Sequence, residues 1–581
     1  MKSCQIFHLS KPQGGKIEEA KLKSRFSFKD RKEILNQSKG QTYDLIVIGG
    51  GINGAGVARD AARRGLSVLC IEKSDLASGT SSRSSKLAHG GLRYLENFEF
   101  RLVFEALNER NHLLKAAPHM VHALEFVIPM YQGDRVSPLK MKMGMLLYDM
   151  LALFRAPKSH SYLTPAKTMA RVKNLNARGL KGAFAYSDAY LDDDRLVFEI
   201  ARDATKYGAH FLTYFEFQSL NQDSSTSQVK VIKTKDMISG REYEFKARHI
   251  LTTVGPWTDV VAEKLIPDWI SRMRPTKGVH LTLNRLDFPI DDAVVMAADK
   301  QKRIIFAIPR QEMVIIGTTD TDFKADPTSV NTTNDDVDYL INIIQEYFPL
   351  AEIDRSKIVA SYCGVRPLVK EASSHEKIAE SKISRDHVVV TDPRGFTFLM
   401  GGKYTTYRLM CEEALDVVLT HFTKAERASY KKCSTKDLLN SKIDTKTYFE
   451  SLAKVGQLAE KSGLSHLQAK MLVERHGPEA WDIIENHKYE YVWEYEAAHA
   501  LEHTCCATLL DFYTRRVHLF LGKSDHGFKF LKRIGKIFKD YYSWTDEELN
   551  QQIQNVFNHS KSELSWKDLT DLPHPDKMEY V

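Results

Sequence analysis

The chain has 581 residues, 43% of them hydrophobic and 27% charged, the balance of a globular protein with room for two or three domains. No apolar run approaches the roughly eighteen residues of a membrane-spanning helix, and residues 1–16 lack the apolar core of a secretion signal. The net charge of +7 allows an anionic partner, whether lipid headgroup, nucleic acid or substrate, without selecting one.

The seven cysteines lie at positions 4, 70, 363, 411, 433, 505 and 506. They form no Cys-x-x-Cys pair and no Cys/His pattern typical of zinc ligands. The sequence therefore predicts neither a disulfide framework nor a metal site, and it indicates a reducing compartment.

The first motif with chemical meaning is a strand, a glycine turn and a helix over residues 43–64, followed by a second strand over 67–71. In the turn, Gly49, Gly51 and Gly54 form the pattern GxGxxG. Glycines there let the backbone approach a pyrophosphate at the helix N-terminus. Glu72 ends the second strand, where a carboxylate accepts hydrogen bonds from ribose hydroxyls. The arrangement predicts a bound dinucleotide.

The following segment favours FAD over NAD. An NAD-binding domain usually continues into another helix, whereas this chain continues with KSDLASGTSSRSSKLAHGGLRYL, residues 73–95. Its backbone N–H groups and the side chains of Ser81, Ser82 and Lys86 suit a diphosphate and a flavin ring. A Gly-Pro turn at Gly255 follows an apolar strand and gives the backbone a second place to touch the dinucleotide.

Taken in order, eight stretches resemble the FAD-dependent glycerol-3-phosphate dehydrogenase family. They are DLIVIGGGINGAGVARDAARRGLSVL, TSSRSSKLAHGGLRYLENFEFRLVFEALNER, TTVGPW, KGVHL, IIGTTDTDF, YCGVRPL, ISRDHVV and GGKYTTYR, and they cover about residues 43–410. The resemblance implies an α/β protein with three parts. These are a discontinuous glutathione-reductase-like FAD-binding domain, a D-amino-acid-oxidase-like substrate domain built on an antiparallel sheet, and a C-terminal helical domain.

On this basis we expect five regions along the chain. Residues 1–42 are a Lys-rich extension, either mobile or wrapped on the surface. The FAD-binding domain takes residues 43–130, 188–260 and 385–420, and the substrate domain takes 131–187 and 261–384. Residues 421–560 form the helical domain, and residues 561–581 are a loose tail.

The implied substrate is sn-glycerol 3-phosphate, which becomes dihydroxyacetone phosphate by losing the C2 hydrogen as hydride to the flavin and the hydroxyl proton to a base. Its phosphate is best bound by charged groups that donate two parallel hydrogen bonds, and the guanidinium of arginine is such a group. The resemblance places Arg366 and Arg385 against the substrate. Arg93 and Lys403 are further candidates, and Arg93 alternatively anchors its own loop.

The candidate base is His280, because the ordinary pKa of histidine, about 6.5, suits proton abstraction near neutrality. His89 is the alternative, and it could instead flank the flavin. His89, Arg93 and Tyr94 are expected to face the substrate. The side of the flavin and substrate site opposite these residues is expected to be the start of a helix. Its backbone N–H groups suit the electron-rich end of reduced flavin. Its expected residues are Gly402, Thr405 and Thr406.

The resemblance also implies that electrons pass to a membrane quinone from an enzyme bound peripherally to the cytoplasmic side of the inner membrane. Two segments are candidates for the contact. Residues 528–542 place apolar side chains on one arc and Lys532, Arg533, Lys536 and Lys539 opposite, which fits either a basic amphipathic helix or a helix packed in a domain core. Residues 139–154 are methionine-rich and apolar almost all round, which fits either core packing or a lipid-facing surface.

Other functions stay open at this point. A glycerol-3-phosphate oxidase would use oxygen and make hydrogen peroxide, but the family's oxidases usually carry an insertion in the substrate domain that is not seen here. An amine or amino-acid oxidase of the same fold would also pair a carboxylate with arginine. A nucleic-acid-binding role is disfavoured, because no basic stripe with interleaved aromatic residues occurs. The quinone type and the oligomeric state, a homodimer included, are not determined by the sequence.

Overall fold

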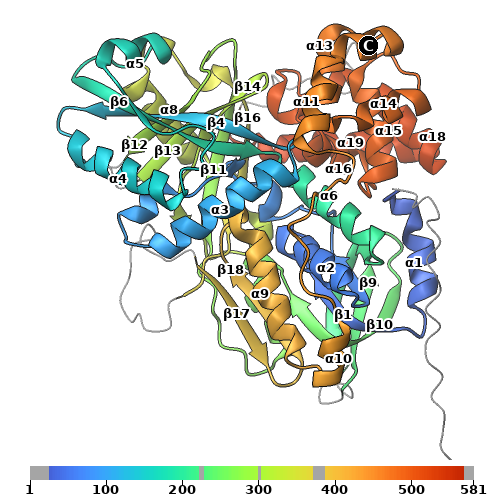
Figure 1. Ribbon diagram of the computed structural model, residues 1–581. Helices are drawn as coiled ribbons and strands as arrows, with labels where there is room; N and C mark the ends of the chain where they lie inside the picture. Colours follow the sequence, from blue (N-terminus) through green and yellow to red (C-terminus); the bar gives the residue numbers. More distant parts are fainter. Residues whose placement is uncertain (1–24, 222–227, 299–302, 371–385, 568–581) are drawn as a thin grey trace, which may run out of the picture.

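The computed structural model describes residues 25–221, 228–298, 303–370 and 386–567. Its strands form two β-sheets, and helices cover both of them (Figure 1). The first sheet lies at the bottom of Figure 1, the second at the upper left, and the helices that follow residue 440 at the upper right.

The first sheet contains the predicted dinucleotide motif. Its order is β17-β18-β10-β1-β2-β7, and β8 and β9 extend it beside β10. The strands β18, β10, β1, β2 and β7 run parallel, while β17, β9 and β8 add antiparallel pairs. The strands are β1 (Thr42–Ile48), β2 (Val68–Glu72), β7 (His210–Thr213), β8 (Phe215–Leu220), β9 (Lys230–Asp236), β10 (Glu242–Thr252), β17 (His387–Asp392) and β18 (Phe396–Gly401).

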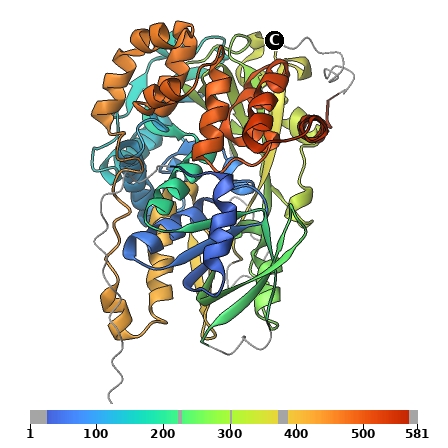
Figure 2. The same cartoon turned by 90° about the vertical axis from the view of Figure 1, so that its right-hand side faces the viewer.

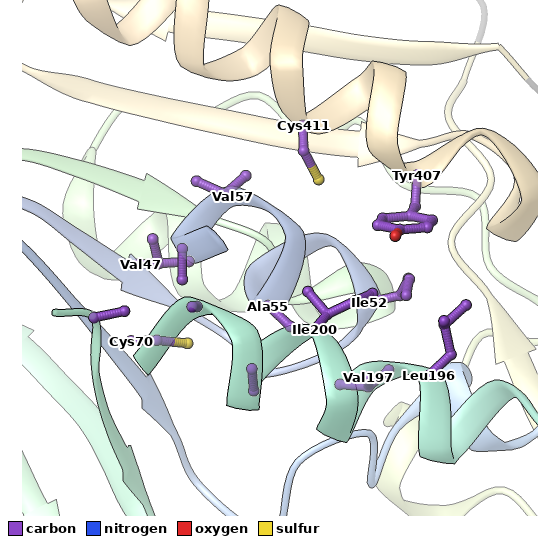
Figure 3. Close-up of a cluster of buried hydrophobic side chains, with 14 of the residues drawn as sticks. Val47, Ile52, Ala55, Val57, Cys70, Leu196, Val197, Ile200, Tyr407 and Cys411 are labelled. Atoms are coloured by element: carbon purple, nitrogen blue, oxygen red, sulfur yellow. The ribbon is translucent and has the colours of Figure 1, made fainter. Parts of the chain in front are cut away.

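Helix α2 (Ile52–Arg64) follows the glycine turn and packs between α6 (Asp193–Lys206) and α9 (Tyr407–Leu419). Figure 3 shows Tyr407 and Cys411 of α9 on one side of α2 and Leu196, Val197 and Ile200 of α6 on the other. Small residues let the helices approach closely, since a Cβ atom on Gly56 would lie 2.7 Å from the Cys411 sulfur. This packing fixes the N-terminus of α2 at the edge of the first sheet.

The second sheet has the order β15-β11-β14-β13-β12-β4-β6-β3, with β16 beside β11 and β5 beside β6. Every pair in it is antiparallel except β4 with β12. The strands are β3 (Leu87–Ala88), β4 (Val121–Tyr131), β5 (Ser161–Leu163), β6 (Leu180–Leu191), β11 (Thr276–Asn284), β12 (Ala293–Ala298), β13 (Arg303–Arg310), β14 (Met313–Gly317), β15 (Thr321–Asp322) and β16 (Ile358–Arg366).

The two faces of the second sheet pack against different helices. Val279, Leu281 and Leu283 of β11 point toward α8 (Asn334–Tyr347) in one buried cluster. The opposite face packs against α3 (Phe100–Ala116) and α4 (Pro138–Leu151) in another. Because side chains alternate along a strand, His280 lies on the face of α3 and α4.

The helices that follow residue 440 form the C-terminal region, which Figure 2 shows above the first sheet. It contacts both sheets, since Arg516 pairs with Asp75 beside the first and the indole of Trp566 donates a 2.8 Å hydrogen bond to Ser361 of the second. Helix α10 (Lys424–Ser429) lies beside the first sheet, where Glu426 pairs with Arg248 of β10. The helices of the C-terminal region are α11 (Thr445–Ala453), α12 (Val455–Ser462), α13 (His466–His476), α14 (Glu479–Asn486), α15 (Val492–His503), α16 (Leu509–Asp511), α17 (Leu519–Gly522), α18 (Leu531–Tyr542) and α19 (Asp546–Glu563).

Three expected boundaries differ from the structure. The FAD-binding domain is expected to run to residue 130, but β4 pairs with β6 and β12 in the second sheet. The loose tail is expected from residue 561, but Leu564 and Trp566 are buried against the second sheet. Part of the N-terminal extension is also held, because the backbone of Phe26 exchanges hydrogen bonds with Glu502 and Cys505. Each difference reflects contacts between residues far apart in sequence.

The basic amphipathic segment is α18, and its apolar arc is buried in the core of the C-terminal region. Leu531, Ile534 and Phe538 are fully buried there. Arg533 pairs with Glu494 at 3.1 Å and with Glu490 at 3.0 Å. The structure therefore supports the alternative of a domain helix and not a lipid-binding one. Among the described helices, none is long and apolar enough to cross a bilayer.

Candidate active site

The glycine turn between β1 and α2 leaves room for a dinucleotide backbone. Gly49 has a φ of +104°, and a Cβ atom on Gly54 would lie 1.8 Å from the Gly49 carbonyl oxygen. At Gly51 the nearest atom to an added Cβ would be the Ser81 hydroxyl oxygen, at 3.0 Å. That oxygen accepts a 3.0 Å hydrogen bond from the Ile52 N–H at the N-terminus of α2. The predicted positions of these glycines and of Ser81 fit a pyrophosphate bound at a helix N-terminus.

Glu72 lies at the end of β2, beside the same turn. Its carboxylate accepts hydrogen bonds from the N–H groups of Gly50 at 2.7 Å and Ser74 at 3.0 Å. Burial raises the pKa of Glu72 above its ordinary value. Gly255, with a φ of +56°, begins the short helix η5 (Gly255–Trp257) after β10, as the predicted second turn requires. These groups match the side of a dinucleotide site that binds ribose and diphosphate.

A cavity of about 910 Å³ lies between the loop after residue 79, strands β11 and β16, and α4. Most of the predicted catalytic residues line it. They are His89, Arg93, Tyr94, His280, Arg366 and Lys403. The structure thus brings together residues that are up to 314 positions apart in the chain, since His89 and Lys403 both border this space.

His280 is buried on β11, between β14 and β16. Its ring stacks on Tyr362 with centroids 4.7 Å apart, and its Nε2 lies 2.8 Å from the Ser85 hydroxyl. Burial, with the positive charges of Arg366 and Lys86, holds the pKa of His280 well below its ordinary value. The imidazole is therefore neutral near pH 7, as a base must be.

Arg366 ends β16 and has its guanidinium held in place from several sides. It donates to Asp320 at 3.0 Å, to the Thr318 hydroxyl at 2.9 Å and to the Thr319 carbonyl at 3.1 Å. The strand register puts Arg366 opposite Thr276 and His280 opposite Tyr362, so both side chains lie on the same face. A forked cation is thus fixed on the same wall as the candidate base.

Two glycines between these residues keep that wall open. Gly278 and Gly364 face each other in the register of β11 and β16. A Cβ atom on Gly278 would lie 2.3 Å from a guanidinium nitrogen of Arg366, and one on Gly364 would lie 2.6 Å from the Cβ of Arg83. Side chains at these positions would displace Arg366 and the loop of Arg83.

The ammonium of Lys86, which is predicted to contact FAD, is held by carboxylates of α6. Its ammonium is buried in an ion pair with Asp193, at the start of α6, and Asp194 lies 3.7 Å away. The two carboxylates raise the pKa of Lys86 despite its burial. Lys86 therefore anchors the loop to α6 and does not border the cavity. Ser82 has its hydroxyl 3.5 Å from the Gly79 carbonyl, within the loop itself.

The opposite wall is the segment from Gly402 to the start of α9. Both Gly401 and Gly402 have positive φ, of +70° and +83°, and the short helix η10 (Tyr404–Thr406) follows. The hydroxyl of Thr405 accepts a 3.3 Å hydrogen bond from the His89 N–H, and Thr406 is buried beside it. The Lys403 ammonium lies 3.5 Å from the centre of the Tyr94 ring. The predicted helix start is therefore in place against the loop of His89.

Arg385 lies outside the described residues. Sequence reasoning missed Asp320 and Thr318, which orient Arg366, and Asp193, which holds Lys86. Thr318 and Asp320 stand in the motif IIGTTDTDF, so the signal was present without an assigned role. Nothing local marks Asp193, because its partner is 107 residues away.

A dinucleotide cradle on a parallel sheet, joined to a cavity with a fixed arginine and a neutral buried histidine, defines a flavoprotein oxidoreductase. The family described as FAD dependent oxidoreductase matches residues 44–408, and that described as the C-terminal domain of alpha-glycerophosphate oxidase matches residues 447–549. The chain belongs to the FAD dependent oxidoreductase family. This membership confirms FAD as the cofactor and confirms the predicted fold class.

Relatives with assigned names point to one activity. The aerobic glycerol-3-phosphate dehydrogenase of Bacillus subtilis is 31% identical over 92% of this chain and 98% of its own length. That of Staphylococcus aureus strain USA300 is 33% identical over 79% of this chain and 83% of its own. The glycerol-3-phosphate dehydrogenase structure from Bacillus halodurans, complexed with FAD, has a TM-score of 0.75 and 25% identity, covering 93% of this chain and 99% of that one. These similarities confirm the resemblance found in the sequence.

Proposed function

We propose that the protein oxidises sn-glycerol 3-phosphate to dihydroxyacetone phosphate and passes the electrons to a membrane quinone. The observation that carries the proposal is the shared wall of Arg366 and His280 in one cavity. The relatives' names support the substrate, and the fixed guanidinium supports a phosphate ligand.

The predicted residues that line the cavity take different tasks in this reaction. Arg366, whose terminal nitrogens are held by Asp320, Thr318 and the Thr319 carbonyl, attracts the phosphate through its fixed positive charge. Arg93 and Lys403 add positive charge around it. His280 takes the proton of the C2 hydroxyl, and Ser85 orients the imidazole through Nε2. The glycine turn of Gly49, Gly51 and Gly54 would hold FAD, which would supply the acceptor for the C2 hydrogen as hydride. The stacked ring of Tyr362 holds His280 in position while the proton moves.

The substrate is tested by anaerobic mixing. Glycerol 3-phosphate should remove the yellow absorbance of the purified holoprotein, whereas glycerol, lactate and D-alanine should not. Bleaching by D-alanine and not by glycerol 3-phosphate would favour an amino-acid oxidase, whose carboxylate substrate would also pair with Arg366.

The lowered pKa of His280 predicts the acid side of the pH profile. Because a base acts when neutral, kcat/KM should stay level as the pH falls from about 8 to about 6.5, the ordinary pKa of histidine, and decline only below it. The profile is measured with a dye acceptor, and that of His280→Gln gives the baseline, since the substrate phosphate itself titrates near about pH 6. If kcat/KM falls to half of its maximum at pH 7 or above, another group is the base.

The quinone part of the proposal rests on an exposed apolar surface beside the cavity. On the outer side of α4 and the turn after it, Leu139, Met143 and Phe154 are 71%, 67% and 66% exposed. We call this surface the α4 patch. It comprises Leu139, Met143, Leu146, Met150, Leu153 and Phe154, with Phe98, Phe100 and Phe104 from the adjoining segment.

Several members of the α4 patch also border the cavity, among them Phe98, Met143 and Met150. Lys140, Lys142 and Arg155, on α4 and in the turn after it, are exposed cations. Exposed apolar side chains on one side of a helix, with cations on the same segment, fit the interface of an anionic membrane. Electrons would thus leave the flavin on the side that meets lipid.

Replacing both Leu139 and Phe154 by glutamate should weaken binding to anionic liposomes at least about tenfold, because burying each apolar side chain contributes about 1.5–3 kcal/mol. Neither residue borders the cavity, so turnover with a soluble dye should be kept. Co-sedimentation at low salt measures the binding, and Lys536→Glu on α18 is the control that should bind normally. If wild-type protein does not co-sediment with liposomes and converts oxygen to peroxide stoichiometrically, the oxidase alternative replaces the quinone proposal.

A further inference from the structure

We propose that Tyr148 is a positioning residue, whose hydroxyl group fixes the loop of His89, Arg93 and Tyr94 for substrate binding. The inference rests on the proposed function, because it assigns that loop to the substrate. Tyr148 lies on the inner side of α4 and is only 2% exposed.

The hydroxyl of Tyr148 makes two hydrogen bonds. It accepts from the Gly90 N–H at 3.0 Å and donates to the Asp188 carboxylate at 2.7 Å. Asp188 is also paired with Arg110 of α3, and both of these charged groups are fully buried. Because the carboxylate can only accept, the Tyr148 proton points to Asp188 and its lone pair is left for Gly90.

The glycine at position 90 is required by this arrangement. A Cβ atom there would lie 2.6 Å from the Tyr148 hydroxyl and 2.6 Å from a methyl carbon of Leu107. The backbone of the loop is thus pressed against α3 and α4, where its N–H group is out of contact with water. A buried N–H without a partner costs about 1–3 kcal/mol, so the hydroxyl determines where this N–H can lie.

The position of Gly90 determines where the residues that follow it lie. Gly91, with a φ of +76°, turns the chain into the short helix η3 (Leu92–Leu95), which carries Arg93 and Tyr94 into the cavity. On the other side, the His89 N–H is held by Thr405. The loop is therefore fixed between η10 and α4, and Tyr148 supplies the α4 side.

The same helix carries the α4 patch on its outer side. Tyr148 therefore joins the substrate loop to the element that would meet the membrane, through one hydrogen bond. Burial and the neighbouring Asp188 raise the pKa of Tyr148 well above its ordinary value, so the hydroxyl stays protonated throughout the working pH range.

The test is Tyr148→Phe, which keeps the ring and removes only the hydroxyl. The KM for glycerol 3-phosphate should rise about five- to thirtyfold, the equivalent of about 1–2 kcal/mol, with a smaller effect on kcat and unchanged FAD content. Hydrogen–deuterium exchange in peptides covering residues 89–95 should become faster without substrate. Tyr513→Phe is the matched control, since that tyrosine is 1% exposed and its hydroxyl donates a 3.2 Å hydrogen bond to Gly527 far from the cavity.

The outcomes separate this inference from the proposed function. If wild-type protein does not react with glycerol 3-phosphate, the function fails, and exchange in residues 89–95 still reports on Tyr148. If wild type reacts and Tyr148→Phe matches it in KM and in exchange, the inference is overturned. Should Tyr148→Phe fail to fold, Asp188→Asn removes the charge that orients the same hydroxyl. It should raise KM in the same direction by a smaller factor, and an unchanged KM would refute the inference.

Discussion

Arg366→Lys is expected to lower kcat/KM for glycerol 3-phosphate by about 10- to 100-fold while the protein keeps its FAD. Lysine keeps the charge but loses the planar guanidinium, whose several N–H groups fix the position of that charge. It also cannot reproduce the simultaneous bonds to Asp320, Thr318 and the Thr319 carbonyl that aim the guanidinium. Steady-state kinetics with a dye acceptor measures the loss, and the flavin absorbance confirms the cofactor content.

Arg355→Lys provides the matched control for this measurement. Arg355 also forms a forked pair, with Asp338 at 3.0 and 2.7 Å, but it is exposed on the surface. Exposed pairs of this kind contribute at most about 1 kcal/mol to stability and should not change kinetics. Equal kcat/KM values for Arg366→Lys and wild type would show that the phosphate is bound elsewhere, with Arg93 and Lys403 the next residues to test.

The cofactor cradle was predictable from the sequence because its determinants are local. Gly49, Gly51 and Gly54 and the carboxylate of Glu72 belong to a single strand–turn–helix–strand unit, and the structure keeps each where the pattern places it. His280 and Arg366 were assigned through the family resemblance. Their placement on one wall comes from the pairing of β11 with β16, which no local pattern specifies.

Other contacts could not be predicted because they depend on the fold. A lysine among serines suggests a contact with FAD, but the ammonium of Lys86 pairs with Asp193, which only the fold brings near. Likewise, an amphipathic pattern says which arc of a helix avoids water, not whether protein or lipid covers it. The apolar arc of α18 is covered by the protein core of the C-terminal region, whereas the apolar side chains on the outer side of α4 are exposed.

Gly51→Val is expected to give a folded protein without its yellow colour. Gly51 has an extended backbone, with φ of −77° and ψ of −168°, which valine adopts readily. Among the described residues, the side chain nearest to an added Cβ is Ser81, whose hydroxyl oxygen lies 3.0 Å away and needs to shift only slightly. The added methyl groups would instead occupy the space where the backbone approaches the pyrophosphate. FAD affinity should fall more than about tenfold, which corresponds to about 1.4 kcal/mol.

Gly54 shows why the choice of glycine matters in this experiment. A Cβ atom there would lie 1.8 Å from the Gly49 carbonyl oxygen, so a substitution would break the turn itself and could not separate folding from FAD binding. Gly456→Val in α12 is the matched control, because no atom lies within 4 Å of a Cβ atom added there. The ratio of flavin to protein absorbance, with circular dichroism to monitor folding, gives the result. Stoichiometric FAD in folded Gly51→Val would place the pyrophosphate outside this turn.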